Sequence, residues 1–330
     1  STRIDSALTM FILFVLTWCV PAVSRKLVLE VTENAHLQGM VDECGLMDPL
    51  WQRAQSLFGV AEPKAVCSAI GLFYQASCDG RPSGEVCRTE YSLGNVTVVF
   101  ERMWKNGNNE MDCRLGALDH VVRRRTEAGA TLRQDHAKSF HFALLRDPLQ
   151  RFVSGFSESM YRMGWYTELA TTPEGAQQVI LRMLKGSFQF IGEGRHMRAQ
   201  FPTLVQQQPQ FTWDLLNIDQ AWSAVVETAG IDFEFDAHEG CGAHPETQEG
   251  SGFAPREAVQ LLLQSRSLLA DALSCSLLLP DYVCLGYTLN ATACVEAGFS
   301  SSSSAWDLTV AAVRAHFCPT LDRLDLGGTH

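Results

Sequence analysis

The stretch FALLRDPLQRFVSGF, from Phe142 to Phe156, joins an apolar run to a helix-start signal. Residues 140–145 are apolar enough to form a buried strand. Asp147 can cap a helix and Pro148 suits a first helical turn, so we expect a helix from Pro148 to Arg162. A strand that leads directly into a helix is typical of α/β proteins.

A similar unit precedes this one in the chain. Asn95–Phe100 reads as a buried strand, Trp104–Asn109 as a polar turn and residues 110–126 as a mixed helical stretch. Two successive strand-helix units predict an α/β domain with a parallel sheet flanked by helices. Further helices are expected at Pro173–Lys185, Asp219–Ala229 and Pro255–Leu279, and a short strand at Ile231–Phe235.

The ends of the chain suggest additional segments. Residues 1–24 contain the apolar run Ala7–Val23, followed by small residues, which fits either a cleaved signal peptide or a short type II membrane anchor. We expect a cysteine-rich leading segment at 25–94, a catalytic domain at 95–299, and a Ser-rich linker with a C-terminal tail at 300–330.

Cysteine usage fits the secretory route. The chain has 11 cysteines, of which Cys19 lies in the leader, and ten remain for disulfide bonds whose pairing the sequence does not define. Two glycosylation sequons, at Asn95 and Asn290, also suit a lumenal glycoprotein.

The charge is acidic overall and basic in one region. A net charge of −11 argues against nucleic-acid binding. Yet ten of the 26 basic residues fall between positions 102 and 151, which indicates a local anion site: Arg102, Lys105, Arg114, Arg123, Arg124, Arg125, Arg133, Lys138, Arg146 and Arg151. The three arginines at 123–125 are equally typical of a solvated helix face.

Two short motifs in this basic region can bind phosphate. Arg146 ends a strand at the carboxyl edge of the sheet, and Ser154 follows two turns into the next helix, whose N-terminus attracts anions. Lys105 and Gly107 lie in the turn after the earlier strand, where glycine allows the backbone to approach an anion. The sequence also permits an ordinary helix start and a plain Asn/Gly turn, and it contains no Walker A motif.

Together these motifs resemble the two cofactor motifs of sulfotransferases. The segment Arg-Asp-Pro-x-x-Arg-x-x-Ser matches fully from Arg146 to Ser154, whereas the lysine turn keeps Lys105 and Gly107 but has Asn108 and Asn109 where the family has hydroxyl residues. Two weaker segments, Arg195–Gln200 and Asp281–Tyr287, resemble stretches of the Golgi carbohydrate sulfotransferases.

The resemblance implies a P-loop-like three-layer fold and an enzyme that transfers sulfate from 3′-phosphoadenosine 5′-phosphosulfate to a glycan or proteoglycan hydroxyl, without a metal. Lys105 would stabilise the leaving phosphate, Arg146 and Ser154 would hold the 3′-phosphate, and His120 or His136 would act as general base. The rest of the lysine turn would contact the cofactor: Asn106, Gly107, Asn108 and Asn109.

The resemblance also implies a Golgi membrane protein with a lumenal catalytic domain, or a secreted protein if residues 1–24 are removed. The membrane would be contacted only through that N-terminal segment. The departures at Asn108 and Asn109 leave open a catalytically weakened protein that binds nucleotide or glycan. A nucleotide-dependent kinase is a third reading, against which the missing Walker A motif argues.

Overall fold

The computed structural model describes most of the chain between residues 44 and 318. The described ranges are 44–59, 74, 86–93, 96–103, 105–118, 122–127, 138–163, 170–184, 196–230, 253–265 and 267–318. Residues 46–330 form one compact unit. The predicted leader at 1–24, the predicted strand at 231–235 and the sequon at Asn95 lie outside the described residues.

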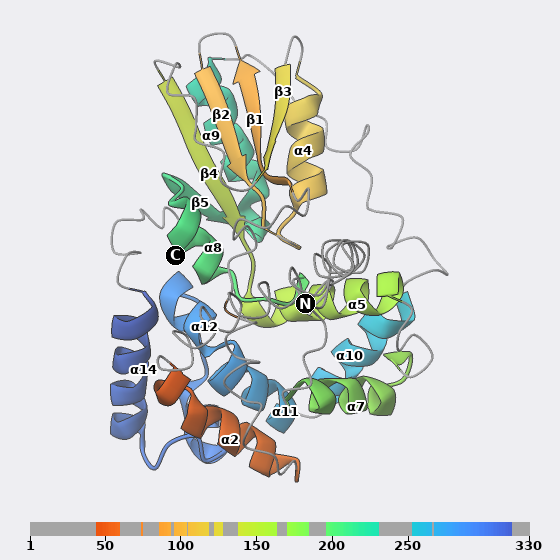
Figure 1. Ribbon diagram of the computed structural model, residues 1–330, viewed down its shortest axis with the longest axis vertical. Coiled ribbons are helices and arrows are strands. Elements are labelled where there is room, and N and C mark those ends of the chain that lie inside the picture. The colour runs from red at the N-terminus through yellow and green to blue at the C-terminus, as the bar shows by residue number, and fades with distance from the viewer. Residues whose placement is uncertain are drawn as a thin grey trace, which may run out of the picture. The chain divides into compact units, whose positions relative to one another are not determined.

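A five-stranded sheet in the order β3-β1-β2-β4-β5 is drawn in the upper half of Figure 1. The strands are β1 (Val86–Leu93), β2 (Val96–Glu101), β3 (Val122–Glu127), β4 (Lys138–Leu145) and β5 (Phe211–Asp214). β2, β4 and β5 are mutually parallel, which confirms the α/β class. The sheet also contains β1, which the sequence did not predict and which is antiparallel to both of its neighbours. Only two residues separate β1 from β2, and so short a connection joins antiparallel strands.

The arginines at 123–125 lie on a strand rather than on a helix face. They belong to β3, the edge strand that pairs with β1. The expected helix over 110–126 ends early: α4 spans Asn108–Gly116. A strand depends on its distant partner, here β1, and this partner cannot be recognised from the local residue pattern.

One face of the sheet carries the main hydrophobic core. Alternate residues of β2 and β4 point to this face, as the two-residue period of a strand requires. They pack against α4 and against α9 (Ile218–Ala229), through residues that include Met111, Leu115 and Trp222. The packing of α4 against the sheet fixes the turn that precedes this helix.

The opposite face of the sheet holds a buried polar group. Glu101 is fully buried; its Oε1 lies 2.5 Å from His141 Nε2 and 2.9 Å from Arg88 Nη2. His141 is therefore a packed residue of β4.

Helix α5 (Pro148–Met163) leaves the end of β4 as the sequence predicts. Its first turn is capped by Asp147, whose Oδ1 accepts a hydrogen bond of 2.9 Å from the Gln150 amide. The described helices that follow or surround it include α2 (Asp48–Leu57), α7 (Pro173–Leu184), α8 (Phe201–Gln207) and α10 (Phe253–Ser265). Helix α10 packs against both α5 and α7 (Figure 1).

The expected long helix at Pro255–Leu279 is broken into shorter pieces. After α10 come α11 (Ser267–Ala272), a π-helical turn η5 (Leu273–Leu277) and α12 (Leu279–Leu285). Within the described ranges no single helix is long and apolar enough to cross a membrane, although Leu268–Leu277 and Leu279–Leu285, bent by 65°, pass by length and composition as a pair. Leu273, Cys275 and the whole of α12 are buried.

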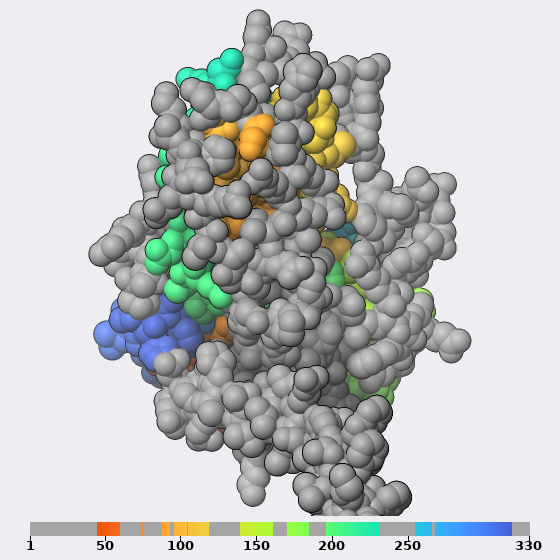
Figure 2. Space-filling view, turned by 45° about the horizontal axis from the view of Figure 1, so that its top comes forward, coloured from red at the N-terminus to blue at the C-terminus, as the bar shows by residue number. Residues whose placement is uncertain are grey.

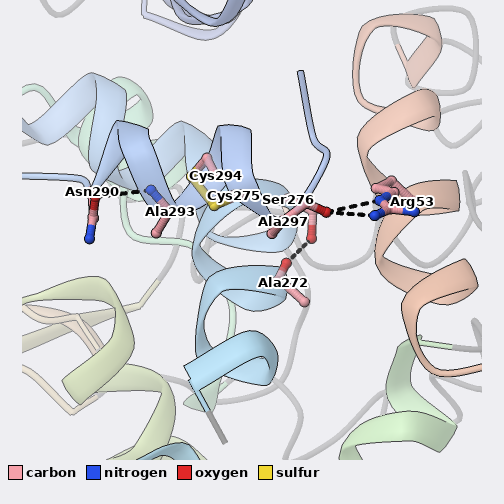
Figure 3. The surroundings of a disulfide bond; sticks show 8 residues. All are labelled: Arg53, Ala272, Cys275, Ser276, Asn290, Ala293, Cys294 and Ala297. Carbon is pink, nitrogen blue, oxygen red and sulfur yellow. Dashed lines mark hydrogen bonds between the residues drawn. A yellow bond between two sulfur atoms is a disulfide. The ribbon is translucent and has the colours of Figure 1, made fainter. Parts of the chain in front are cut away.

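The C-terminal helices are pinned by two disulfide bonds. Cys275 bonds to Cys294 on α13 (Ala291–Glu296), and Cys284 bonds to Cys318 at the end of α14 (Ser303–Phe317). Near the first bond, Arg53 of α2 donates two hydrogen bonds to the Ala297 carbonyl (Figure 3). These links tie segments before and after the sheet to one helical layer.

The expected Ser-rich linker starts a helix instead. Ser302 caps α14 by accepting a hydrogen bond from the Ala305 amide. Serine is a good N-cap because its hydroxyl satisfies an amide that the helix leaves unpaired. Most of the polar side of α14 is exposed, and the blue C-terminal residues lie at the surface in the space-filling view (Figure 2).

Candidate phosphonucleotide site

The turn between β2 and α4 has an unusual backbone. Lys105 and Gly107 both adopt left-handed conformations, with φ of 68° and 75°. Left-handed φ is costly for lysine, and such strain is concentrated at functional sites. At Gly107 an added Cβ would lie 2.4 Å from Leu215 Cδ1, so only glycine fits. The turn therefore combines a strained lysine with a glycine directly before the first turn of α4.

The N-terminus of α4 follows this turn and presents unpaired backbone N–H groups. Asn108 and Asn109 occupy its first two positions, with Asn109 exposed. The Asn108 Oδ1 atom is buried, and none of the described groups hydrogen-bonds to it. This oxygen can only accept a hydrogen bond, so a phosphate at the helix N-terminus would be held by the α4 backbone N–H groups and not by Asn108 Oδ1.

Asn106 supports the turn from within. It is buried, and its Nδ2 donates to the Leu144 carbonyl at 2.8 Å and to Gln200 Oε1 at 2.6 Å. The side chain is therefore directed into the protein, where it attaches the turn to the end of β4. This structural role accounts for the presence of an asparagine at position 106 of the lysine turn.

Arg146 lies at the carboxyl end of β4, as predicted, and contacts the lysine turn. Its Nη1 donates to the Lys105 carbonyl at 3.3 Å. Its backbone amide donates to Gln200 Oε1 at 3.0 Å, and its carbonyl accepts from Gln200 Nε2 at 2.7 Å. Burial and the nearby charge of Arg256 lower the pKa of the Arg146 guanidinium from its ordinary value.

Gln200 and Asp281 complete this arrangement. The backbone N–H of Gln200 donates to both Asp281 carboxylate oxygens, at 2.8 and 2.9 Å. The backbone N–H of Phe201 donates to Asp281 Oδ1 at 2.9 Å. Burial raises the pKa of Asp281, while the charge of Arg151 and these amide hydrogen bonds oppose the rise. Hydrogen bonds thus join the four segments singled out in the sequence, those containing Lys105, Arg146, Gln200 and Asp281.

One face of α5 contributes further groups to the site. Lys105 Nζ donates to Glu158 Oε2 at 2.6 Å, and Glu158 is only 1% exposed. Ser154 is partly buried and lies four residues before Glu158, so both residues share the helix face that meets Lys105. Glu158 was not anticipated from the sequence, although its spacing from Ser154 could have indicated it.

Gly155 allows another segment to pack closely on α5. A Cβ at this position would lie 2.2 Å from the His196 carbonyl oxygen. His196 itself is buried. The close approach brings the segment that carries Gln200 against the helix that carries Ser154.

Arg151, the second arginine of the Arg-Asp-Pro motif, is a buried structural residue. It is 2% exposed and donates a hydrogen bond to the Arg198 carbonyl. Burial lowers its pKa to about 10, and the charge of Asp281 opposes this shift. Arg151 thus joins α5 to the segment that precedes Gln200.

A second polar pair lies at the same edge of the sheet. Tyr287 donates a hydrogen bond to Asp214 Oδ2 at 2.5 Å, and Asp214 is the last residue of β5. Burial and this hydrogen bond raise the pKa of Tyr287. The pair attaches the chain after α12 to the carboxyl edge where parallel α/β sheets bind ligands.

The predicted general bases cannot be placed in this site. His120 and His136 lie outside the described residues, so their role remains a prediction. Glu110 of α4 forms an ion pair with Arg114 of the same helix at 2.9 Å.

Comparison with known proteins supports the sulfotransferase assignment. Residues 86–227 match the model of the sulfotransferase family. The matched range contains Lys105, Arg146, Ser154 and Gln200, and it supports sulfuryl transfer as the general chemistry of this region. No curated protein and no solved structure gives a significant match to the chain.

Proposed function

We propose that this protein transfers a sulfuryl group from 3′-phosphoadenosine 5′-phosphosulfate to a hydroxyl group of a glycan. The observation that carries the proposal is the hydrogen-bonded convergence of the lysine turn, Arg146, Gln200 and Asp281 at one edge of the sheet. Such an edge, with a helix N-terminus and two cationic side chains, suits a nucleotide that carries two phosphate groups.

The chain's own groups divide between charge stabilisation and binding. When bound, the donor supplies the sulfuryl group, whose bond to the 5′-phosphate oxygen breaks as the acceptor oxygen bonds to sulfur. Lys105 would offset the charge that grows on the departing phosphate oxygen. Arg146 and Ser154 would hold the 3′-phosphate. Asn108, Asn109 and the α4 amides would surround the 5′-phosphate. The acceptor proton would go to a histidine, His120 or His136.

Glu158 would position the lysine. Glu158 is buried on α5, and its Oε2 atom lies 2.6 Å from Lys105 Nζ. Ordering a long lysine side chain costs conformational entropy. Because Glu158 already orders the Lys105 side chain, less of this cost arises when the ligand binds. Exchange of Nζ from Glu158 to a phosphate oxygen would then need only a small movement of the ammonium group.

A second candidate function is nucleotide or glycan binding with little or no transfer. Two observations favour it. The Lys105 ammonium group is already paired with Glu158, and asparagines stand at the positions of the family's hydroxyl residues. Both candidates share the proposed nucleotide site and differ only in turnover.

The deciding experiment is transfer of labelled sulfate from the donor to a glycan array by the full chain. Lys105→Gln should abolish transfer while leaving affinity for adenosine 3′,5′-bisphosphate within about tenfold of the wild type, because the other phosphate contacts remain. Arg314→Gln, an exposed change on α14, is the matched control. Bisphosphate binding without transfer to any glycan would favour the second function, whereas no bisphosphate binding would refute both.

A lumenal or secreted location is part of the proposal. The two disulfide bonds among the described cysteines suit an oxidising compartment. We expect residues 1–24 to anchor the protein in the Golgi membrane or to be removed on secretion. Mass spectrometry of the N-terminus after expression in secreting cells would distinguish these outcomes.

A further inference from the structure

A cavity of about 570 Å³ is lined in part by Arg146. It lies where α5, α10 and α12 meet, and α10 packs directly on α5 (Figure 1). Its polar lining includes Arg146, Gln150, Arg256, Gln260, Gln264 and Tyr282. Leucine and valine side chains complete the wall, so the cavity offers both charged and apolar surface.

The described lining of this cavity carries two arginines and one carboxylate. Arg146 and Arg256 both line it, and among the described residues neither arginine forms an ion pair with an acidic side chain. Asp147, the carboxylate of the lining, accepts a hydrogen bond from the Gln150 amide as the cap of α5. Burial and then the charge of Arg256 lower the pKa of Arg146, whereas the charges of Asp147 and Asp214 oppose this shift.

A pair of like charges around one cavity costs free energy unless an anion binds between them. A phosphate dianion would turn this repulsion into two attractions, and guanidinium groups match phosphate oxygens in geometry. The glutamine amides of α10 offer donors and acceptors to a sugar or base. Gln260 and Gln264 lie four and eight residues after Arg256, on the same helix face.

We propose that Arg256 is a second ligand of the phosphate that Arg146 binds, and that this cavity receives the 3′-phosphorylated ribose of the nucleotide. The inference rests on the proposed function and adds a residue that lies beyond the matched range 86–227. Arg256 makes the site selective for nucleotides that carry a 3′-phosphate.

The test is calorimetric titration of the full chain with adenosine 3′,5′-bisphosphate and with adenosine 5′-phosphate. Arg256→Gln should weaken bisphosphate binding about tenfold or more, with little change for the monophosphate, because only the former carries the 3′-phosphate. Arg314→Gln is the control, and Arg146→Gln reports on the proposed function itself.

Two substitutions of opposite charge at the exposed Gln260 give a second test. This test remains informative even if the protein does not tolerate replacement of Arg256. Gln260→Lys should strengthen bisphosphate binding and Gln260→Glu should weaken it, each by about threefold at low salt. Both changes lie on the solvent-exposed side of α10, where folding should be unaffected.

The outcomes separate the two claims. If Arg256→Gln and both Gln260 variants bind like the wild type while Arg146→Gln is weakened, the role of Arg256 is refuted and the proposed function stands. If Arg146→Gln is also unchanged, the 3′-phosphate assignment and the proposed function both fail. Equal weakening of both nucleotides by Arg256→Gln would likewise refute selectivity for the 3′-phosphate.

Discussion

Replacement of Gln200 by methionine should separate the proposed site from the rest of the fold. The Gln200 side chain makes three hydrogen bonds: it accepts from Asn106 and from the Arg146 amide, and it donates to the Arg146 carbonyl. Methionine has similar volume but can make none of them. The change therefore removes the link between the lysine turn and the strand end without opening a large cavity.

The expected cost follows from these contacts. At about 1 kcal/mol for each hydrogen bond, the loss is about 3 kcal/mol in the free energy of unfolding, and polar groups left buried and unpaired add to it. For a chain of this size that corresponds to a fall of about 6 °C in Tm. Because Arg146 loses its backbone support, adenosine 3′,5′-bisphosphate should bind at least about tenfold more weakly.

Urea unfolding and calorimetric titration measure the two effects. Gln52→Met is the matched control, since Gln52 is exposed and donates one hydrogen bond to Asp48 on the same helix. It should change stability by less than about 0.5 kcal/mol. If Gln200→Met behaved like Gln52→Met in both assays, the hydrogen-bonded convergence would not organise the site, and the argument for the proposed function would lose its basis.

Three other changes test the packing around the site. Gly155→Ala should destabilise the fold by about 2 kcal/mol in thermal unfolding, since the added Cβ would lie 2.2 Å from the His196 carbonyl oxygen. Gly116→Ala is the control: its Cβ would have nothing within 4 Å, so the change should be neutral or stabilising in the same assay. Loss of the Cys275–Cys294 bond in a double serine variant should cost about 3 kcal/mol in urea unfolding without reductant, and no difference would show that the bond does not constrain the chain. Burial raises the pKa of Tyr282 to about 12, above an unfolded value of 10.0. The contribution of Tyr282 to the free energy of unfolding is therefore complete below pH 10 and is lost as pH rises through 12. The stability advantage of the wild type over Tyr282→Phe should therefore shrink by roughly 2 kcal/mol between these pH values, and a constant difference would contradict the shift.

Local signals predicted the elements that lead into the site. The apolar run before Arg146, the Asp147 cap and Pro148 each act within a few residues, and β4 and α5 form as expected. The helices α7 and α9 followed from their residue patterns in the same way. The strand β1 was missed because its sequence, VCRTEYSL, has no apolar run, and β3 because its partner β1 is distant in the chain.

The break in the long C-terminal helix was missed for a different reason. The apolar pattern continues from α10 into α12, but η5 adopts π-helical geometry beside the disulfide at Cys275. Its link to Cys294, on another helix, is a constraint that the residue pattern alone does not reveal.

The candidate site shows the same division between local motifs and distant partners. Lys105 and Arg146 carry recognisable motifs, and the structure brings them together through the Lys105 carbonyl. Glu158 and Arg256 are added to the site from positions whose residue types are common on any helix. Their meaning depends on which helices pack on α5, and this packing is decided by the whole core.

The placement of Arg256 has a consequence for how such a site would work. Arg256 lies on α10, whereas Arg146 directly follows the strand β4. A phosphate bound by both arginines would join these two parts of the protein across the cavity. Binding of the bisphosphate should therefore stabilise the fold by more than binding at Arg146 alone, and the gain should be smaller in Arg256→Gln.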